Sequence, residues 1–190
     1  FAKYGVGLLI HPRRYGKPAA LNTIMNQSRG EIVVIVSADT QPTERSISTI
    51  VSYMKRDSRC GLCWGRPLQA RSDGIAGKLF SYSFRLHTLH SLRLNSTGLL
   101  RHASGELMAV RRELIERIPS ECINEDEYIA VTMVKKGFKV KFVHDAIVSI
   151  DAPKNILEYL EQRARWTTGH LQLRDMTGEQ STVAHFYLLY

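Results

Sequence analysis

Gln162, Arg165 and Trp166 bring three different chemical groups to one predicted helix. The helix is expected from Asn155 to Leu173, and the three residues stand at i, i+3 and i+4, so they share one face. An amide can orient a hydroxyl, a guanidinium can hold a phosphate, and an indole can stack on a flat apolar face. The spacing also fits an amphipathic surface helix with Trp166 in the core, so other stretches must decide between the two interpretations.

Acidic residues border two further predicted elements. Asp39 comes just after the apolar run Ile32 to Val36, which is typical of a buried central strand. Polar residues at the carboxyl end of such a strand are where open α/β sheets bind their ligands. Glu125 and Asp126 open a predicted helix, where they suit the positive end of the dipole and where Asn124 is a suitable capping residue. These acids are therefore candidates for catalysis or for helix capping.

The hydrophobic pattern predicts alternating strands and helices that would position these side chains. Strands are expected over Val6 to Ile10, Ile32 to Val36, Cys60 to Arg66, Ser104 to Val110, Lys139 to Val143 and Ala146 to Ile150. Helices are expected over Pro18 to Met25, Glu44 to Lys55, Ile75 to Leu94, Arg112 to Arg117, Tyr128 to Lys136 and Asn155 to Leu173. This order is typical of an α/β domain with a mostly parallel sheet and helices on both faces.

Size and charge narrow the class of protein. The chain has 190 residues, 44% of them hydrophobic, which suits one globular domain with a sizeable core. No repeat or low-complexity linker marks a second domain, so residues 1–190 are expected to form one. The formal net charge of +8 favours an anionic partner such as a phosphorylated molecule or a membrane surface. The basic residues are dispersed and no zinc-finger or RNP signature is present, so nucleic-acid binding is not favoured.

The cysteines and the paired histidines give little support to a redox or metal site. Cys60, Cys63 and Cys122 are too few for a disulfide-stapled secreted domain and fit a reducing compartment. Cys60 and Cys63 form a C-x-x-C inside a predicted strand, which favours two buried apolar side chains. His87 and His90 stand at i and i+3 on a predicted helix, and no third ligand accompanies them in the sequence.

The two ends of the chain suggest a part of a longer protein. The sequence begins on Phe1 without a signal peptide or membrane-spanning run, and it ends on an apolar run over residues 183–190. That run is shorter than the about 20 residues that a spanning helix needs. We expect it to be either the start of a membrane helix or a terminal helix packed on the domain.

Short motifs occur in a fixed order along the chain. They are Gly16-Lys17-Pro18-Ala19-Ala20-Leu21-Asn22, Ser37-Ala38-Asp39, Ser104-Gly105, Asn124-Glu125-Asp126 and Gln162-Arg163-Ala164-Arg165-Trp166. This set resembles the inverting family 2 glycosyltransferases of the GT-A fold, and more narrowly the membrane-associated relatives of hyaluronan, cellulose and chitin synthases. The resemblance covers about Val6 to about Leu173, and Q-x-x-R-W is its most specific motif. It implies transfer of a sugar from a nucleotide-diphospho-sugar to a hydroxyl with inversion, in polysaccharide or glycolipid synthesis.

The resemblance also implies roles for the acids. Asp126 matches the general base, which takes the proton from the attacking hydroxyl, and Glu125 and Gly105 are expected to support it. Asp39 matches the last acid of the family's D-x-D motif and is expected to hold Mg²⁺ or Mn²⁺ beside the diphosphate. Ser37 replaces the first acid of that motif, so metal binding is expected to be weakened.

The other motif residues are assigned to the two substrates by the same resemblance. Lys17, Arg163 and Arg165 are expected on the donor diphosphate, whose negative charge grows as the nucleotide leaves. Gln162 and Trp166 are expected to orient and stack the acceptor, which would be a sugar, a polysaccharide or a lipid-linked sugar.

The family's first strands have no counterpart before Val6, so much of the nucleoside pocket is expected to be missing from this chain. A non-catalytic homologue that binds nucleotide sugar or glycan therefore stays open as an alternative. A basic nucleic-acid-binding domain is a further alternative that only the charge supports. Segments that flank the chain are expected to associate with the membrane, with this domain on its cytoplasmic face.

Overall fold

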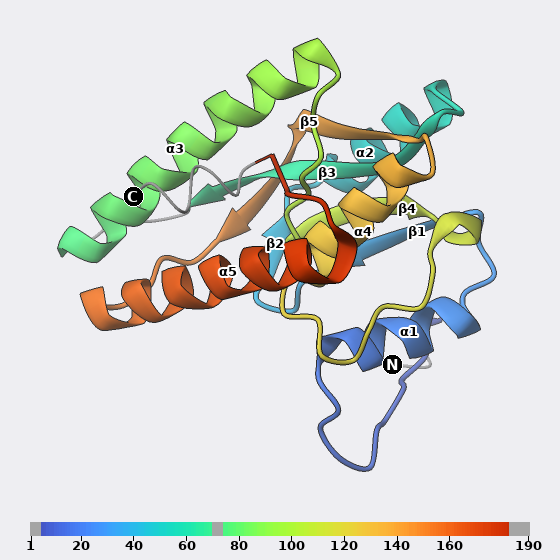
Figure 1. The fold of residues 1–190 in the computed structure, drawn as a ribbon, viewed down its shortest axis with the longest axis horizontal. Coiled ribbons are helices and arrows are strands. Elements are labelled where there is room, and N and C mark those ends of the chain that lie inside the picture. Colours follow the sequence, from blue (N-terminus) through green and yellow to red (C-terminus); the bar gives the residue numbers. More distant parts are fainter. Residues whose placement is uncertain (1–4, 70–73, 183–190) are drawn as a thin grey trace.

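Five strands form one sheet, and helices cover both of its faces in this computed structural model, which describes residues 5–69 and 74–182 (Figure 1). The strands are β1 (Ile32–Val36), β2 (Thr40–Pro42), β3 (Cys60–Gln69), β4 (Leu107–Arg111) and β5 (Lys139–Ile150). The helices are α1 (Lys17–Gln27), α2 (Ser46–Arg56), α3 (Gly74–Thr97), α4 (Glu125–Lys135), α5 (Ile156–Thr177) and the short 3-10 helix η2 (Arg112–Leu114). The α/β class and helices on both faces are as predicted.

The sheet is mixed, so the prediction of a mostly parallel sheet is wrong. Its strand order is β1-β4-β3-β5-β2. Only the pair β3 and β5 is parallel, whereas β1 with β4, β3 with β4 and β2 with β5 are antiparallel. Residues 98–106 carry the chain back along the sheet after α3, so β4 begins near the end at which β3 finishes. Strand and helix alternation fixes neither this return nor the direction of β4.

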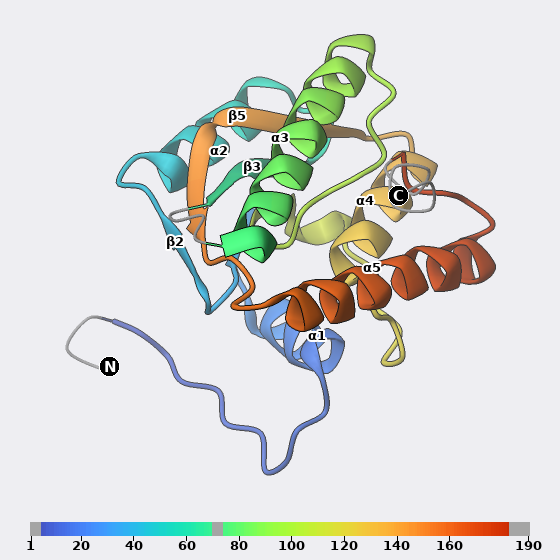
Figure 2. The ribbon, with the colours of Figure 1, turned by 90° about the vertical axis from the view of Figure 1, so that its left-hand side faces the viewer.

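Two predicted strand boundaries also differ from the structure. Residues 5–16 form no strand, and Leu8 and Ile10 are 62% and 80% exposed, because no strand of residues 5–69 and 74–182 pairs with this segment. Figure 2 shows it leaving the body of the domain ahead of α1. The two strands expected on either side of His144 are one continuous strand, β5, whose pairing with β3 shifts register near Gly65.

The sheet separates two hydrophobic clusters. On one face, Leu62 and Trp64 of β3 pack with residues of α1 and α4, including Leu21 and Ile129. On the other face, neighbouring strand residues pack against Ile50 and Met54 of α2. Side chains alternate between faces along a strand, so β3 contributes to both clusters.

Cys60 and Cys63 are buried in the second cluster, as predicted, and their sulfur atoms lie 3.2 Å apart.

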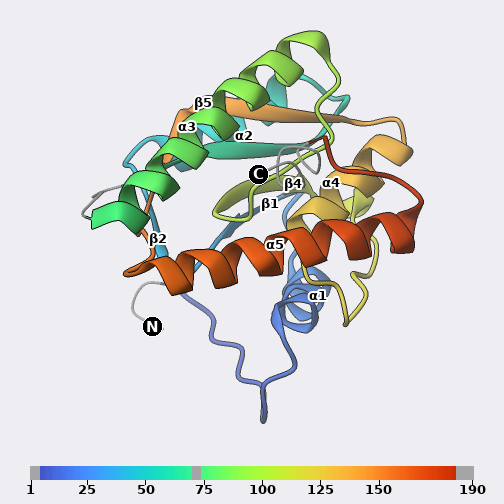
Figure 3. The same ribbon diagram turned by 60° about the vertical axis from the view of Figure 1, so that its left-hand side comes forward.

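Helix α5 crosses the molecule between α3 and α1 (Figure 3). Asn155 caps its start, because its side-chain oxygen accepts a hydrogen bond of 2.9 Å from the backbone N–H of Glu158. Gly178 ends it in a left-handed conformation with φ of 70°. Within residues 5–69 and 74–182, no helix combines the length and apolar character needed to cross a bilayer. Residues 183–190, the predicted membrane or terminal helix, lie outside the described ranges.

Candidate active site

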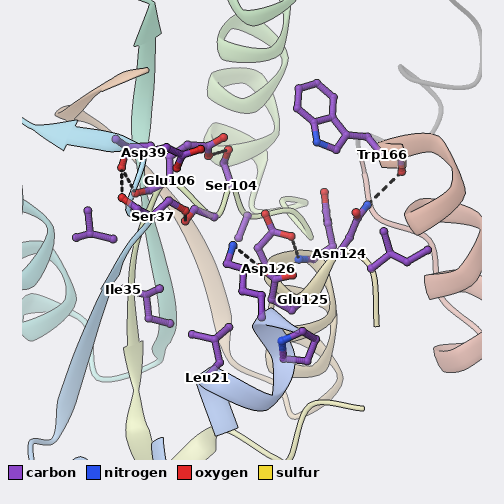
Figure 4. A pocket seen from close by; sticks show the side chains of 18 of the residues that line it. Leu21, Ile35, Ser37, Asp39, Ser104, Glu106, Asn124, Glu125, Asp126 and Trp166 are labelled. Atoms are coloured by element: carbon purple, nitrogen blue, oxygen red, sulfur yellow. Dashed lines mark hydrogen bonds and ion pairs between the residues drawn. The ribbon is translucent and has the colours of Figure 1, made fainter. Parts of the chain in front are cut away.

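A cleft of about 1030 Å³ opens between the ends of β1 and β4 and the helices α1, α4 and α5. Nine of the ten predicted site residues line it: Lys17, Ser37, Asp39, Gly105, Glu125, Asp126, Gln162, Arg165 and Trp166. In Figure 4, Ser37, Asp39 and Glu106 lie on one side, and Glu125 and Asp126 lie on the other. The fold therefore brings together motifs that are far apart in the sequence.

Arg163 is the exception, because it does not line the cleft. Neighbouring residues of a helix project about 100° apart, so a face that presents Gln162 and Trp166 to the cleft turns Arg163 away. Its predicted contact with a diphosphate stays a prediction. Arg165 lines the cleft and its side chain is exposed, so it remains the arginine of α5 that can reach a bound anion.

Asp126 sits in the first turn of α4 and is partly open to the cleft. Its Oδ1 accepts a hydrogen bond of 2.9 Å from the backbone N–H of Glu127. Burial raises the pKa of Asp126 well above its usual range, and the negative charges of Glu125 and Glu127 raise it further, while Lys17 acts in the opposite direction. A carboxylate with a raised pKa accepts a proton more readily, which suits a general base.

Lys17 makes an ion pair with Glu125 at the centre of the cleft. Burial lowers the pKa of Lys17, but the charges of Glu125 and Asp126 outweigh that effect and raise it overall. The lysine therefore stays positively charged beside the two acids. Gly105 permits this arrangement, since a Cβ at that position would lie 3.0 Å from Oδ2 of Asp126 and 3.3 Å from Nζ of Lys17.

Asn124 joins α4 to α5 instead of capping α4. It stands at the N-cap position, but its side chain makes no capping hydrogen bond, which corrects the prediction. Its Nδ2 donates to the backbone oxygen of Trp166 at 3.1 Å. Gly169 completes the contact, because a Cβ there would lie only 2.3 Å from the Asn124 side chain. This glycine lets α5 lie directly against the segment that carries Asp126.

Trp166 takes part in both arrangements considered from the sequence. It packs beside the buried cluster of Phe80, Phe84 and Ile150, with its ring centre 6.3 Å from that of Phe84 in an edge-on arrangement. It is only half-buried and it lines the cleft. The packing fixes the indole while leaving part of it available to a ligand.

Oxygen ligands suited to a hard cation gather on the Asp39 side of the cleft. The Ser37 hydroxyl donates to the backbone oxygen of Gly105 at 2.9 Å, and Ser104 donates to the carboxylate of Glu106. Asp39 and Glu106 thus offer two carboxylates, and Mg²⁺ or Mn²⁺ commonly takes one or two carboxylates together with phosphate oxygens. In the described ranges no three His, Cys, Asp or Glu residues converge as a metal centre, so the set fits only an ion that shares its coordination with a bound diphosphate.

Sequence reasoning missed a row of buried polar side chains behind Asp126. Nε2 of His87 lies 2.6 Å from Nε2 of His102, and Nδ1 of His102 is hydrogen-bonded to Glu127. Nδ1 of His170 lies 4.0 Å from the same Glu127 oxygen. His87, His102, Glu127 and His170 all line the deep end of the cleft. Only the position of Glu127 next to Asp126 was a usable sequence signal.

Comparison with known proteins now identifies the family. The model of the family described as "Glycosyl transferase family group 2" matches residues 32–190. The chain belongs to this glycosyltransferase family.

Two curated relatives of this glycosyltransferase illustrate the range of the match. An N-acetylglucosaminyltransferase of Rhizobium meliloti (strain 1021) is 27% identical over 172 residues, which cover 83% of this chain and 40% of the relative. A poly-beta-1,6-N-acetyl-D-glucosamine synthase of Staphylococcus aureus is 22% identical over 174 residues, which cover 88% of this chain and 42% of the relative. The chain thus spans about two-fifths of the length of these relatives.

Solved structures place the glycosyltransferase in the GT-A fold, as predicted. A mannosyltransferase from Pyrobaculum calidifontis, in complex with GDP-Man and Mn²⁺, superposes with a TM-score of 0.74 at 21% identity, covering 96% of this chain and 50% of that one. Glucosyl-3-phosphoglycerate synthase from Mycobacterium tuberculosis, with Mn²⁺ and UDP, gives a TM-score of 0.51 at 16% identity, covering 90% and 58%. At these identities the likeness shows the fold alone.

Proposed function

We propose that the full-length protein transfers a sugar from a nucleotide-diphospho-sugar to a hydroxyl acceptor with inversion, and that this chain carries the catalytic site. The observation that carries the proposal is Asp126, a carboxylate with a raised pKa that faces the cleft opposite Asp39 and close to Trp166. Inversion needs one base on the acceptor side of the sugar and a stabilised leaving group on the other. The cleft offers candidates for both.

In the proposed reaction, Asp126 removes the proton from the acceptor hydroxyl as its oxygen attacks the sugar. Trp166 stacks against the acceptor ring, and Gln162 orients its hydroxyl groups. Arg165 and Lys17 face the diphosphate, whose negative charge increases as the bond to the sugar breaks. Asp39 and Glu106 would hold Mg²⁺ or Mn²⁺, and the ion would neutralise part of that charge.

We propose N-acetylglucosamine as the first sugar to test. The names of two curated relatives, at 27% and 22% identity, refer to this sugar, and one of those relatives is a polysaccharide synthase. The donor test combines the full-length protein with Mn²⁺ and UDP-GlcNAc, UDP-Glc or GDP-Man, and measures the nucleoside diphosphate released. Release from at least one donor is expected, and the Asp126→Asn variant should lower it by about 10²- to 10⁴-fold. An Asp126→Asn enzyme with normal turnover would exclude this residue as the base.

A non-catalytic homologue that binds a nucleotide sugar is the second candidate. It is favoured by Ser37, which replaces an acid and uses its hydroxyl proton in a hydrogen bond to the Gly105 carbonyl. Calorimetry separates the two candidates. Donor binding without release of nucleoside diphosphate, across several acceptors and with Mn²⁺ present, would favour the binding protein.

We further propose that the protein acts at the cytoplasmic face of the membrane, in polysaccharide or glycolipid synthesis. The family resemblance and the named polysaccharide synthase support this location. Fractionation of cells that express the full-length protein, with and without an alkaline carbonate wash, provides the test. Recovery of the protein only in the soluble fraction would contradict the proposal.

A further inference from the structure

We infer that Glu127, His102 and His87 form a buried hydrogen-bonded chain that positions the Asp126 base and adjusts its basicity. The inference rests on the proposed function, since it concerns the same base. These three are positioning residues, because Asp126 stands between them and the reacting atoms. For brevity, Glu127, His102 and His87 are called the buried chain.

The buried chain joins three parts of the fold. Glu127 belongs to α4, His87 to α3, and His102 to the segment that leads into β4. Their exposed fractions are 3%, 3% and 5%. The two short contacts, His87 with His102 and His102 with Glu127, place the three side chains in series. Trp64 encloses both imidazoles, with ring centres 5.4 Å from His87 and 5.0 Å from His102.

The contacts and the ionisation state of Glu127 together decide which ring nitrogens carry protons. Burial lowers the pKa of His102 to about 3 and that of His87 well below its usual range, so both rings are neutral near pH 7. A neutral imidazole has one N–H donor and one acceptor nitrogen. When Glu127 is ionised, Nδ1–H of His102 donates to Glu127, and Nε2–H of His87 donates to Nε2 of His102. Both contacts of the series are then satisfied without a buried positive charge.

Protonation of Glu127 would reverse this series. The carboxylic acid would donate to Nδ1 of His102, and Nε2–H of His102 would donate to His87. Burial raises the pKa of Glu127 to about 7, while His170 and a hydrogen bond from Ser181 oppose the rise. Both directions of hydrogen-bond donation along the buried chain are therefore accessible near neutral pH.

The charge of the chain reaches the base through a short path. The backbone N–H of Glu127 donates to Oδ1 of Asp126 at 2.9 Å, so the same residue that joins the buried chain also holds the Asp126 carboxylate. The negative charge of Glu127 raises the pKa of Asp126. Above about pH 7 the ionised carboxylate of Glu127 makes Asp126 a stronger base. Below that pH Glu127 is neutral and Asp126 is a weaker base.

Other charged groups face this region and belong in any analysis of its pH dependence. His170 of α5 and His90 of α3 act on the histidines of the buried chain, and Glu125, Lys17 and Glu106 act on Asp126. None of these five groups is altered in the Glu127 and His102 variants described next.

The first test uses Glu127→Gln, which keeps the shape of the side chain and removes its charge. The expected result is that the acid limb of the kcat/KM profile for nucleoside diphosphate release moves to lower pH, by about 0.5–1 unit. Glu113→Gln is the matched control, because Glu113 is exposed and lies outside the cleft lining. A Glu127→Gln profile that is merely lower, with an unmoved limb, would overturn the inference and leave a structural role.

The second test compares two substitutions of His102. Asn keeps a side-chain N–H that can reach Glu127, whereas Leu cannot donate. His102→Asn is expected to retain kcat within a few-fold, and His102→Leu to lose at least about 10-fold with an unchanged KM for the donor. Equal kcat values for two folded variants would contradict the positioning role.

A third measurement separates this inference from the proposed function. Glu127 takes up a proton more readily in the folded protein, so its ionisation should contribute a fall in the melting temperature as pH rises from 5 to 8, opposite in sign to the contribution of the buried histidines. Glu127→Gln should remove that contribution to the fall, so the melting temperature of the variant minus that of the wild type should increase from pH 5 to pH 8, whether or not any donor is turned over. If no donor is turned over but this difference increases, the proposed function fails and the charge switch within the chain stands. If the difference does not change with pH, the charge switch is wrong.

Discussion

Asp126 combines a chemical use with a cost to the folded state. Its pKa is raised by burial and by two neighbouring acids, so the ionised form that a base must adopt is disfavoured in the folded chain. When folding raises the pKa of a group, the folded state becomes less stable as pH increases from the unfolded pKa toward the folded pKa. The residue proposed for catalysis is therefore also a residue that destabilises the fold at neutral pH.

Asp126→Asn should raise the stability of the folded protein while it lowers transfer. The amide removes the buried charge and keeps the side-chain volume, so the melting temperature at pH 8 is expected to rise by about 2–4 °C, equivalent to roughly 1 kcal/mol. At pH 4 the difference should disappear, because the wild-type carboxyl is protonated there. Thermal unfolding at both pH values provides the measurement. A lower melting temperature at pH 8 would show that the ionised carboxylate is well solvated in the cleft.

Lys17 should shift the base in the direction opposite to Glu127. Its charge lowers the pKa of Asp126, so Lys17→Gln should raise that pKa and move the acid limb of kcat/KM to higher pH, by about 0.5–1 unit. Lys55→Gln, an exposed change on α2, is the control for loss of one positive charge. If the acid limb of kcat/KM does not move in Lys17→Gln, the charge of Glu125 cancels the effect of Lys17 on the pKa of Asp126.

At the residue scale, the sequence was enough to predict the site residues that lie together in local motifs. Asp126 and the pair Arg165 and Trp166 were predicted because adjacent residues or helical spacing place them together. His102 and Glu106 were missed because each reaches the cleft only through the pairing and packing of distant strands. No periodicity or capping preference marks such a residue in advance.

Helix α5 is held against α4 by a close contact that depends on one missing side chain. Gly169 leaves room for the Asn124 side chain, and Asn124 in turn donates to the backbone of Trp166. The face of α5 that carries Gln162, Arg165 and Trp166 is thereby set at a fixed height above Asp126.

Gly169→Ala should move α5 away from α4. The added methyl would overlap the buried amide, with an expected cost of about 1–3 kcal/mol in the free energy of unfolding and a larger loss in kcat/KM. Asn124→Ala alone loses about 1 kcal/mol of hydrogen bonding but opens space. The double variant should therefore be more stable than additivity predicts, as a double-mutant cycle measured by chemical denaturation would show.

Thr168→Ala serves as the control on the same helix, because Thr168 is exposed. Additive effects of Gly169→Ala and Asn124→Ala would mean that the two side chains do not compete for the same space.

At the element scale, the sequence predicted helices better than strand directions. The five longer helices were all expected, with boundaries that differ by a few residues, because their apolar faces repeat along the sequence. The direction of β4 and the continuity of β5 depend on where loops return and on register with a distant partner. The segment around Leu8 has the composition of a strand, but β propensity needs a partner to become a strand.

The molecule as a whole holds several histidines neutral in its interior. The pKa values of His87, His102 and His170 are all lowered, mainly by burial. Below about pH 6.5 the unfolded chain binds protons that the folded chain excludes, so these groups remove stability as pH falls, for His102 down to its folded pKa of about 3. The raised pKa of Glu127 acts in the opposite direction between about pH 7 and 4.5.

His102→Asn should make the folded protein less sensitive to acid. As pH decreases from 6.5 to 4.5, its melting temperature is expected to fall less steeply than that of the wild type. The difference between the two slopes should be about 2–4 °C per pH unit. His144→Asn, at a half-exposed position on β5, is the control. Parallel curves for His102→Asn and wild type would indicate that His102 is protonated in the folded state.

Strand order has a consequence for how the chain is made. β5 is the last of the five described strands in the sequence, yet it lies between β3 and β2. During synthesis from the N-terminus, the edge of β3 has no neighbour on that side until residue 150 has emerged, several seconds after Gln69 at about 5–20 residues per second. An open, apolar strand edge can pair with another nascent chain. Slower translation or saturated chaperones should therefore cause misassembly of this domain before any loss of native stability is seen.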